Sequence, residues 1–166
     1  SPIVGYFGVI DERIDLQLLH ETAQLLPNVS FVMIGPLAKI EDADLPKESN
    51  IHYLGMRSYN ELPNYLKAFD IAMMPFAIND ATKYISPTKT LEYMAAGKPI
   101  ISTKITDVVR DYSNCVKLIE TADEFAVAIT LLIDTRDEQV CMPVEYYEIL
   151  KNTSWDATAE QMESII

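Results

Sequence analysis

Short apolar runs that stop at glycine or proline alternate with stretches of helical spacing, and this alternation strongly limits the folds open to the chain. Residues 29–34 form a nearly continuous apolar run that ends at Gly35 and Pro36, as expected for a strand covered on both faces. Parallel strands need long crossover connections, and helices are the usual ones. The pattern therefore predicts an α/β fold, a Rossmann-like, doubly wound, parallel six-stranded sheet with helices on both faces.

The same reading divides the chain into a core and a tail. The predicted strands are residues 3–7, 29–34, 51–54, 70–75, 99–102 and 116–119. The predicted helices are residues 14–26, 61–69, 86–96 and 122–133, with a loop or short helix before residue 111. Residues 1–166 then make one domain, with a core over 1–133 and a helical tail over 134–166. The tail holds two acidic helices, 144–152 and 155–166, whose apolar residues must pack on this sheet or on a missing partner.

Composition and charge exclude several classes of protein. A chain of 166 residues with 49% hydrophobic residues can bury a core without disulfides. The net charge of −12 has the wrong sign for holding nucleic acid. No apolar run approaches the roughly 20 residues that span a bilayer. Cys115 and Cys141 lack partners at zinc-ligand spacing, which fits a reducing, cytoplasmic setting.

A basic segment stands out in this acidic chain. Residues 83–104 contain four lysines and a single acidic residue, Glu92. Such a local excess of positive charge indicates a small anionic ligand, or else a solvated, lysine-rich surface.

Within this segment, a helix start combines donors with a carboxylate. Ser86 is a good N-cap, Pro87 suits the first helical position, and Thr88 and Lys89 follow in the first turn. Unpaired backbone N–H groups, hydroxyls and a lysine at a helix start favour the binding of a phosphate group. Glu92 shares a helix face with Lys89 and could accept hydrogen bonds from ribose hydroxyls. The alternative is an ordinary helix cap with a surface ion pair between Lys89 and Glu92.

Several common catalytic motifs are absent. The segment GYFG is not GxGxxG, and neither GxxxxGK[ST] nor GxSxG occurs. These absences disfavour a dinucleotide oxidoreductase, a P-loop NTPase and an α/β hydrolase.

The segment YISPTKTLEYMAAGKPIIST resembles the nucleotide-sugar-binding signature of the group 1 glycosyl transferases, through EYMAAGKPII at residues 92–101. IGP at residues 34–36, YLGMRSYNELPNYLKAFDIAMMPF at 53–76 and GYFGVIDERIDLQLL from Gly5 resemble other parts of the family in the same order. The resemblance covers about residues 2–133. It implies the C-terminal half of a two-domain GT-B enzyme, with the N-terminal acceptor half absent from this chain.

The resemblance also implies a set of donor-binding residues. Glu92 would hold the ribose, and Arg13 with the turn at Gly8 would grip the diphosphate. Met56 and Arg57 fall where the family contacts the nucleobase. The remaining residues of the diphosphate-facing turn are Ser86, Pro87, Thr88 and Lys89.

The implied reaction is transfer of a hexosyl group from a UDP- or GDP-sugar to an acceptor hydroxyl, with retention of configuration, in cell-surface polysaccharide or glycolipid synthesis. No cofactor or metal is expected, because a helix N-terminus with Lys89 and Arg13 can stabilise the leaving diphosphate. The acceptor, a saccharide or lipid-linked saccharide, and the catalytic residues belong mainly to the missing half. That half would bring the enzyme to the inner membrane face, and the isolated domain is expected to be inactive.

Two departures from the family pattern keep alternatives open. Tyr84 stands where many relatives have a glutamate that contacts the transferred sugar, and Val9 follows Gly8 where an arginine is commoner. The alternatives are one half of a sugar-nucleotide 2-epimerase and a non-catalytic nucleotide-sugar-binding or scaffold module.

Overall fold

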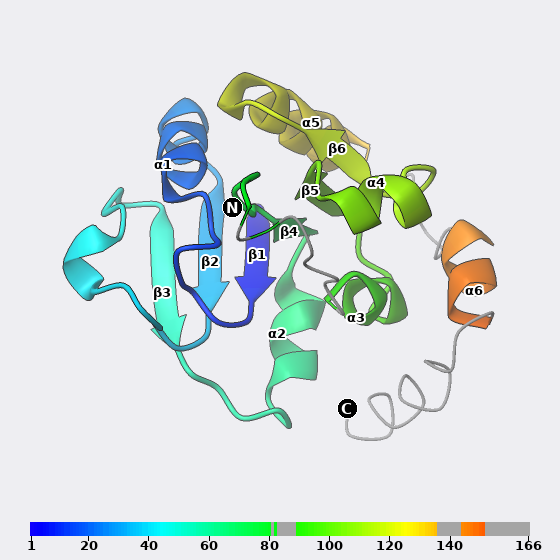
Figure 1. Ribbon diagram of the computed structural model, residues 1–166, viewed down its shortest axis with the longest axis horizontal. Coiled ribbons are helices and arrows are strands. Elements are labelled where there is room, and N and C mark those ends of the chain that lie inside the picture. Colours follow the sequence, from blue (N-terminus) through cyan, green and yellow to red (C-terminus); the bar gives the residue numbers. More distant parts are fainter. Residues whose placement is uncertain (81, 83–88, 136–143, 152–166) are drawn as a thin grey trace.

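The computed structural model describes residues 1–80, 82, 89–135 and 144–151 (Figure 1). The strands are β1 (Ile3–Phe7), β2 (Ser30–Ile34), β3 (Ile51–Gly55), β4 (Ile71–Met74), β5 (Ile100–Thr103) and β6 (Lys117–Ile119). The α-helices are α1 (Leu16–Leu25), α2 (Leu62–Ala68), α3 (Lys89–Ala95), α4 (Thr106–Tyr112), α5 (Ala122–Asp134) and α6 (Val144–Lys151). A 3-10 helix, η1 (Asp42–Asp44), precedes β3.

The strands form one six-stranded sheet in the order β3-β2-β1-β4-β5-β6, and every neighbouring pair is parallel. Helices α1 and α5 pack together on one side of the sheet, while α2 and α3 lie on the other (Figure 1). The predicted Rossmann-like, doubly wound fold is confirmed. The segment expected to be a loop or short helix is α4, and the other element ends differ from the predicted ones by a few residues.

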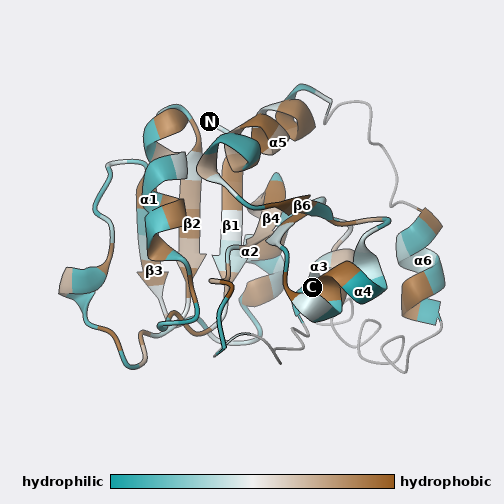
Figure 2. Cartoon of the chain, turned by 45° about the horizontal axis from the view of Figure 1, so that its top comes forward, coloured by the Kyte–Doolittle hydropathy of each residue, from teal (hydrophilic) through white to brown (hydrophobic). Residues whose placement is uncertain are grey.

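The central strands are apolar along their whole length because helices cover both of their faces. All four residues of β4 are buried, and so are the last four of β1. Figure 2 shows these strands mainly in the colours of apolar residues, whereas α1 alternates between polar and apolar faces. Gly5 in β1 leaves room for the ring of Phe69, which a β-carbon would meet at 2.3 Å. The core thus fixes β1 and β4 side by side.

The first predicted tail helix packs on this same domain. Helix α6 contacts α3. The Tyr146 side chain of α6 is only 1% exposed, and its hydroxyl donates to the Lys98 carbonyl at 2.9 Å. Leu150 is buried as well. The other apolar tail residues, which are Trp155, Met162, Ile165 and Ile166, lie outside the described residues. In the described ranges, no helix combines the length and apolarity needed to cross a membrane.

Candidate functional site

Three of the predicted site residues that the structure describes, Gly8, Arg13 and Lys89, lie at or near the carboxyl ends of β1 and β4, where the strand order reverses. Open α/β sheets bind ligands in the crevice at such a point. The loops that follow the two strands are joined by backbone hydrogen bonds, from Asp15 N to Pro75 O at 2.8 Å and from Ala77 N to Arg13 O at 2.7 Å. These two hydrogen bonds therefore hold together loops that are distant in the sequence, at the carboxyl end of the sheet.

Gly8 ends β1 in a conformation that favours glycine. Its φ is +140°, and that of Gly35 at the end of β2 is +146°. The Gly8 N–H donates to Ile34 O at 2.8 Å, and a β-carbon on Gly35 would lie 1.8 Å from Gly8 O. The two turns pack backbone to backbone, which explains why glycine follows both strands.

Lys89, the first residue of α3, reaches back to β1. A β-carbon on Gly8 would lie 2.2 Å from Lys89 Cε and 2.6 Å from its Nζ. The same Nζ lies 5.7 Å from the centre of the Tyr6 ring. Burial lowers the pKa of Lys89, with Arg13 acting in the same direction, while the charges of Glu92 and Asp11 oppose the shift. The Lys89 ammonium group is thus partly desolvated, at the carboxyl end of β1.

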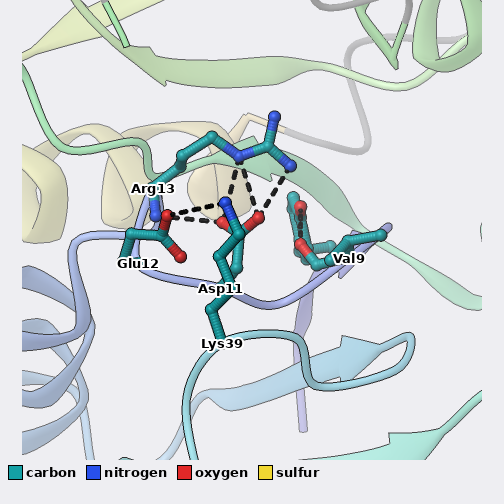
Figure 3. Close-up of polar contacts among 6 residues, drawn as sticks. Val9, Asp11, Glu12, Arg13 and Lys39 are labelled. Atoms are coloured by element: carbon teal, nitrogen blue, oxygen red, sulfur yellow. Dashed lines mark hydrogen bonds and ion pairs between the residues drawn. The ribbon is translucent and has the colours of Figure 1, made fainter. Parts of the chain in front are cut away.

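Arg13 and Asp11 form a close pair in the loop after β1 (Figure 3). Arg13 Nε donates to both carboxylate oxygens of Asp11, at 3.0 and 2.9 Å, and Arg13 Nη2 lies 2.9 Å from Oδ2. The Asp11 side chain is 8% exposed and that of Arg13 is 40% exposed. The carboxylate is therefore buried under a guanidinium group whose outer part meets solvent.

Glu92 lies one turn after Lys89 on α3. Burial raises the pKa of Glu92, and the nearby Lys89 charge opposes this shift. The pKa of Tyr59, in the loop after β3, is raised by burial and by the charge of Glu92. Lys89 and Glu92 are both half-buried.

Met56 and Arg57 lie just after β3, which is an edge strand of the sheet. Met56 is 69% exposed. Arg57 Nε donates to the Tyr65 hydroxyl at 2.9 Å, and Nη1 donates to Met56 O at 3.2 Å. The guanidinium carbon lies 6.0 Å from the Tyr65 ring centre. The structure thus brings Lys89 beside Gly8, where the charges of Arg13 and Glu92 act on it, whereas Met56 and Arg57 follow an edge strand of the sheet. Ser86, Pro87, Thr88 and Tyr84 lie outside the described residues.

Two residues of the site were not identified from the sequence. Asp11 is the first, and its position two residues before an arginine is the signal that could have identified it. Tyr93, the residue after Glu92, is the second, and it is fully buried. Its hydroxyl accepts a hydrogen bond from Phe7 N at 3.4 Å and donates to Met73 O at 3.2 Å. Tyr93 therefore ties α3 to both central strands.

The acidic residues of the described chain do not gather as metal ligands would, since no group of three His, Cys, Asp or Glu side chains is found there. The Asp-x-Asp sequence at Asp42 and Asp44 lies in η1. Asp42 accepts a hydrogen bond from Lys47 Nζ, and Asp44 accepts one from Glu41 N.

The sequence is similar to those of known proteins. The family model described as glycosyl transferases group 1 matches residues 1–135. TuaH of Bacillus subtilis (strain 168), named as a teichuronic acid biosynthesis glycosyltransferase, is 29% identical over 106 residues, which cover 62% of this chain and 27% of TuaH.

Solved structures share the fold. Anabaena Alr3699/HepE in complex with UDP-glucose superposes with a TM-score of 0.72 at 18% identity, over 98% of this chain and 47% of that one. Sucrose-phosphate synthase from Thermosynechococcus elongatus gives a TM-score of 0.75 at 18% identity, over 99% of this chain and 44% of that one. The chain spans about a quarter of the length of TuaH and less than half of each solved structure.

Proposed function

Because the chain belongs to the group 1 glycosyl transferases, we propose that it is the donor-binding half of an enzyme that transfers a sugar from a nucleoside diphosphate sugar to an acceptor hydroxyl. The observation that carries this proposal is the place of Lys89 beside Gly8, where the strand order reverses, with the charges of Arg13 and Glu92 acting on Lys89.

The two cations suit a diphosphate. Lys89 is a half-buried ammonium group whose pKa is lowered by burial, so an anion placed beside it would restore much of what desolvation costs. Arg13 presents the outer part of its guanidinium group to solvent, and arginine pairs well with phosphate oxygens. During transfer, the diphosphate leaves with growing negative charge, and cations fixed in advance stabilise that charge. Lys89 and Arg13 are therefore proposed to bind the donor and to assist departure of the leaving group.

Glu92 suits the ribose. A half-buried carboxylate is poorly solvated, as its raised pKa reflects, and it gains from accepting hydrogen bonds from two neighbouring hydroxyls. Met56 and Arg57 belong to the same loop as Tyr59, whose pKa is raised by burial and by the charge of Glu92. A nucleotide laid from Gly8 past Glu92 would bring its base to this loop.

We further propose the finer features of the enzyme. The donor is of the UDP or GDP type, and HepE, which shares the fold, has been solved with UDP-glucose. The name of TuaH supports polysaccharide synthesis. Hexosyl transfer with retention, and an N-terminal half that binds the acceptor, complete the proposal.

Calorimetric titration tests the proposal directly. The chain is titrated with UDP-glucose, GDP-mannose and ADP-glucose, and binding of at least one is expected. The control is the double variant Arg13→Gln/Lys89→Gln, which should lose most of the affinity for that ligand while remaining folded. Failure of the unsubstituted chain to bind any of the three would contradict donor binding and favour a scaffold module.

A second assay separates transfer from epimerisation. A longer protein containing this chain is incubated with the bound donor and no acceptor. The transferase proposal predicts that the sugar of the donor keeps its configuration. Appearance of the 2-epimer would favour the epimerase instead.

A further inference from the structure

We propose that Asp11 is a positioning residue, which holds the Arg13 guanidinium group so that its outer part faces the diphosphate of the donor. This inference rests on the proposed function, because it gives Arg13 a diphosphate to bind.

The contacts of Asp11 converge on one side of Arg13 (Figure 3). Asp11 Oδ1 accepts hydrogen bonds from the backbone N of Arg13 at 2.9 Å and from its Nε at 3.0 Å. Oδ2 lies 2.9 Å from Nε and 2.9 Å from Nη2. The Asp11 carboxylate thus contacts both the backbone N–H of Arg13 and the Nε and Nη2 groups of its guanidinium group. The pair uses Nε and Nη2, and 40% of the Arg13 side chain remains exposed.

Burial makes the arrangement rigid. The Asp11 side chain is 8% exposed, and a carboxylate is costly to bury unless its oxygens are paired. The backbone around it is also fixed, because Ile14 N donates to Asp11 O at 3.1 Å and Ile10 N donates to Pro36 O at 2.9 Å. A long side chain held in this way loses little further conformational freedom when an anion binds.

Simple electrostatics predicts the opposite effect of Asp11 on binding. A negative charge close to an anion site repels the ligand, so its removal should strengthen diphosphate binding. If Asp11 positions Arg13, its removal should instead weaken diphosphate binding, because the guanidinium group then has to be ordered by the ligand. The two accounts predict opposite changes in diphosphate affinity when Asp11 is removed, so one measurement can decide between them.

The substitution Asp11→Asn separates the hydrogen bond with the Arg13 backbone from the charged contact with the Arg13 guanidinium group. The amide oxygen can still accept the hydrogen bond from Arg13 N, so the turn is kept. The charged second oxygen that contacts the guanidinium group is lost. Glu12→Gln is the matched control, because it removes one negative charge from the neighbouring residue, which pairs with Lys39 Nζ at 3.5 Å.

The readout is the ratio of the affinities for UDP and uridine, measured by calorimetry. We expect Asp11→Asn to lower this ratio about tenfold, as for the loss of one well-directed, charge-assisted contact. Glu12→Gln should leave it unchanged or slightly higher. In an Arg13→Gln background, Asp11→Asn should no longer lower the ratio, because positioning requires the guanidinium group. What remains there is the loss of a negative charge near Lys89, which should leave the ratio unchanged or slightly higher.

A second variant covers the case in which Asp11→Asn fails to fold. Arg13→Lys keeps the positive charge and Asp11 but loses the fork of nitrogens, and it should lower the ratio as well. An unchanged or higher ratio in Asp11→Asn, or an equal fall in the Arg13→Gln background, would overturn the positioning role and leave the proposed function standing. Equal affinity of the unsubstituted chain for UDP and uridine would overturn both.

Discussion

The end of the Lys89 side chain occupies the space beside Gly8 in which any other residue would place its β-carbon. That atom would lie 2.2 Å from Lys89 Cε and 2.6 Å from Nζ. The turn at the end of β1 and the first residue of α3 therefore depend on one another, and both belong to the proposed diphosphate site.

Substituting Gly8 with alanine should damage binding more than folding. The φ of +140° is unfavourable for alanine, which costs roughly 1 to 3 kcal/mol of unfolding free energy. The new methyl group would also displace the Lys89 ammonium group. We expect a lower unfolding midpoint and a lower ratio of UDP to uridine affinity, measured by thermal unfolding and calorimetry.

Gly55→Ala is the matched control for this substitution. Gly55 also has a positive φ, +73°, but a β-carbon there would meet nothing within 4 Å. It should lower the unfolding midpoint and keep the affinity ratio. A normal ratio in Gly8→Ala would show that Lys89 does not need its place beside Gly8.

Diphosphate selectivity should fall as the pH rises toward the alkaline range. Burial and Arg13 lower the pKa of Lys89, against the opposing charges of Glu92 and Asp11. The ammonium group therefore loses its proton at a lower pH than an ordinary lysine does, and diphosphate binding weakens with it. The measurement is the UDP to uridine affinity ratio from about pH 7.5 to about pH 10, in which the titration of the base cancels. In Lys89→Arg the ratio should stay flat, and a flat ratio in the unsubstituted chain would exclude Lys89 as the titrating contact.

Glu92→Gln should weaken ribose recognition by roughly 1 to 2 kcal/mol, because a neutral amide replaces a charged acceptor. The folded state is expected to tolerate the change. Burial raises the pKa of Glu92, so ionised Glu92 costs folded-state stability as the pH rises through that pKa, and glutamine removes this cost at neutral pH.

A 2′-deoxy ligand distinguishes ribose recognition from a structural role. The unsubstituted chain should bind UDP more tightly than 2′-deoxy-UDP, and Glu92→Gln should narrow this difference. A large fall in the unfolding midpoint with an unchanged preference for ribose would instead assign Glu92 to the helix alone.

Tyr146→Phe should lower the free energy of unfolding without changing the affinity for UDP. The substitution removes the hydrogen bond to the Lys98 carbonyl, which contributes about 0.5 to 1.5 kcal/mol. Tyr147→Phe is the control, since Tyr147 is exposed and should leave stability unchanged. Chemical denaturation measures both, and equal stability of the two variants would show that this bond does not anchor α6.

The fold was largely predictable because each buried strand is marked by its own residues. Strand β4 is a run of four buried apolar residues, and the glycines after β1 and β2 mark turns that only glycine fits easily. The pairing order of the strands and the packing of α6 on α3 depend on contacts between distant residues. The acidic, amphipathic sequence of α6 indicated a helix but left its partner open.

The site was predictable only in part, for a similar reason. A helix start with Lys89 and Glu92 is a local pattern, and it can be recognised along the sequence. Asp11 acquires its importance from burial under Arg13 and from the short distances between the two side chains. Those distances depend on how the loop after β1 packs against the loop after β4, which residue spacing does not show.

The affinity difference between UDP and uridine tests the central claim most directly. Calorimetry on the unsubstituted chain should give markedly tighter binding of UDP, because charge-assisted contacts from Arg13 and Lys89 to phosphate contribute roughly 1.5 to 3 kcal/mol each. Added salt should reduce the difference, since part of it is electrostatic. Equal affinities for UDP and uridine, at low and high salt alike, would contradict the assignment of this sheet edge as a diphosphate site.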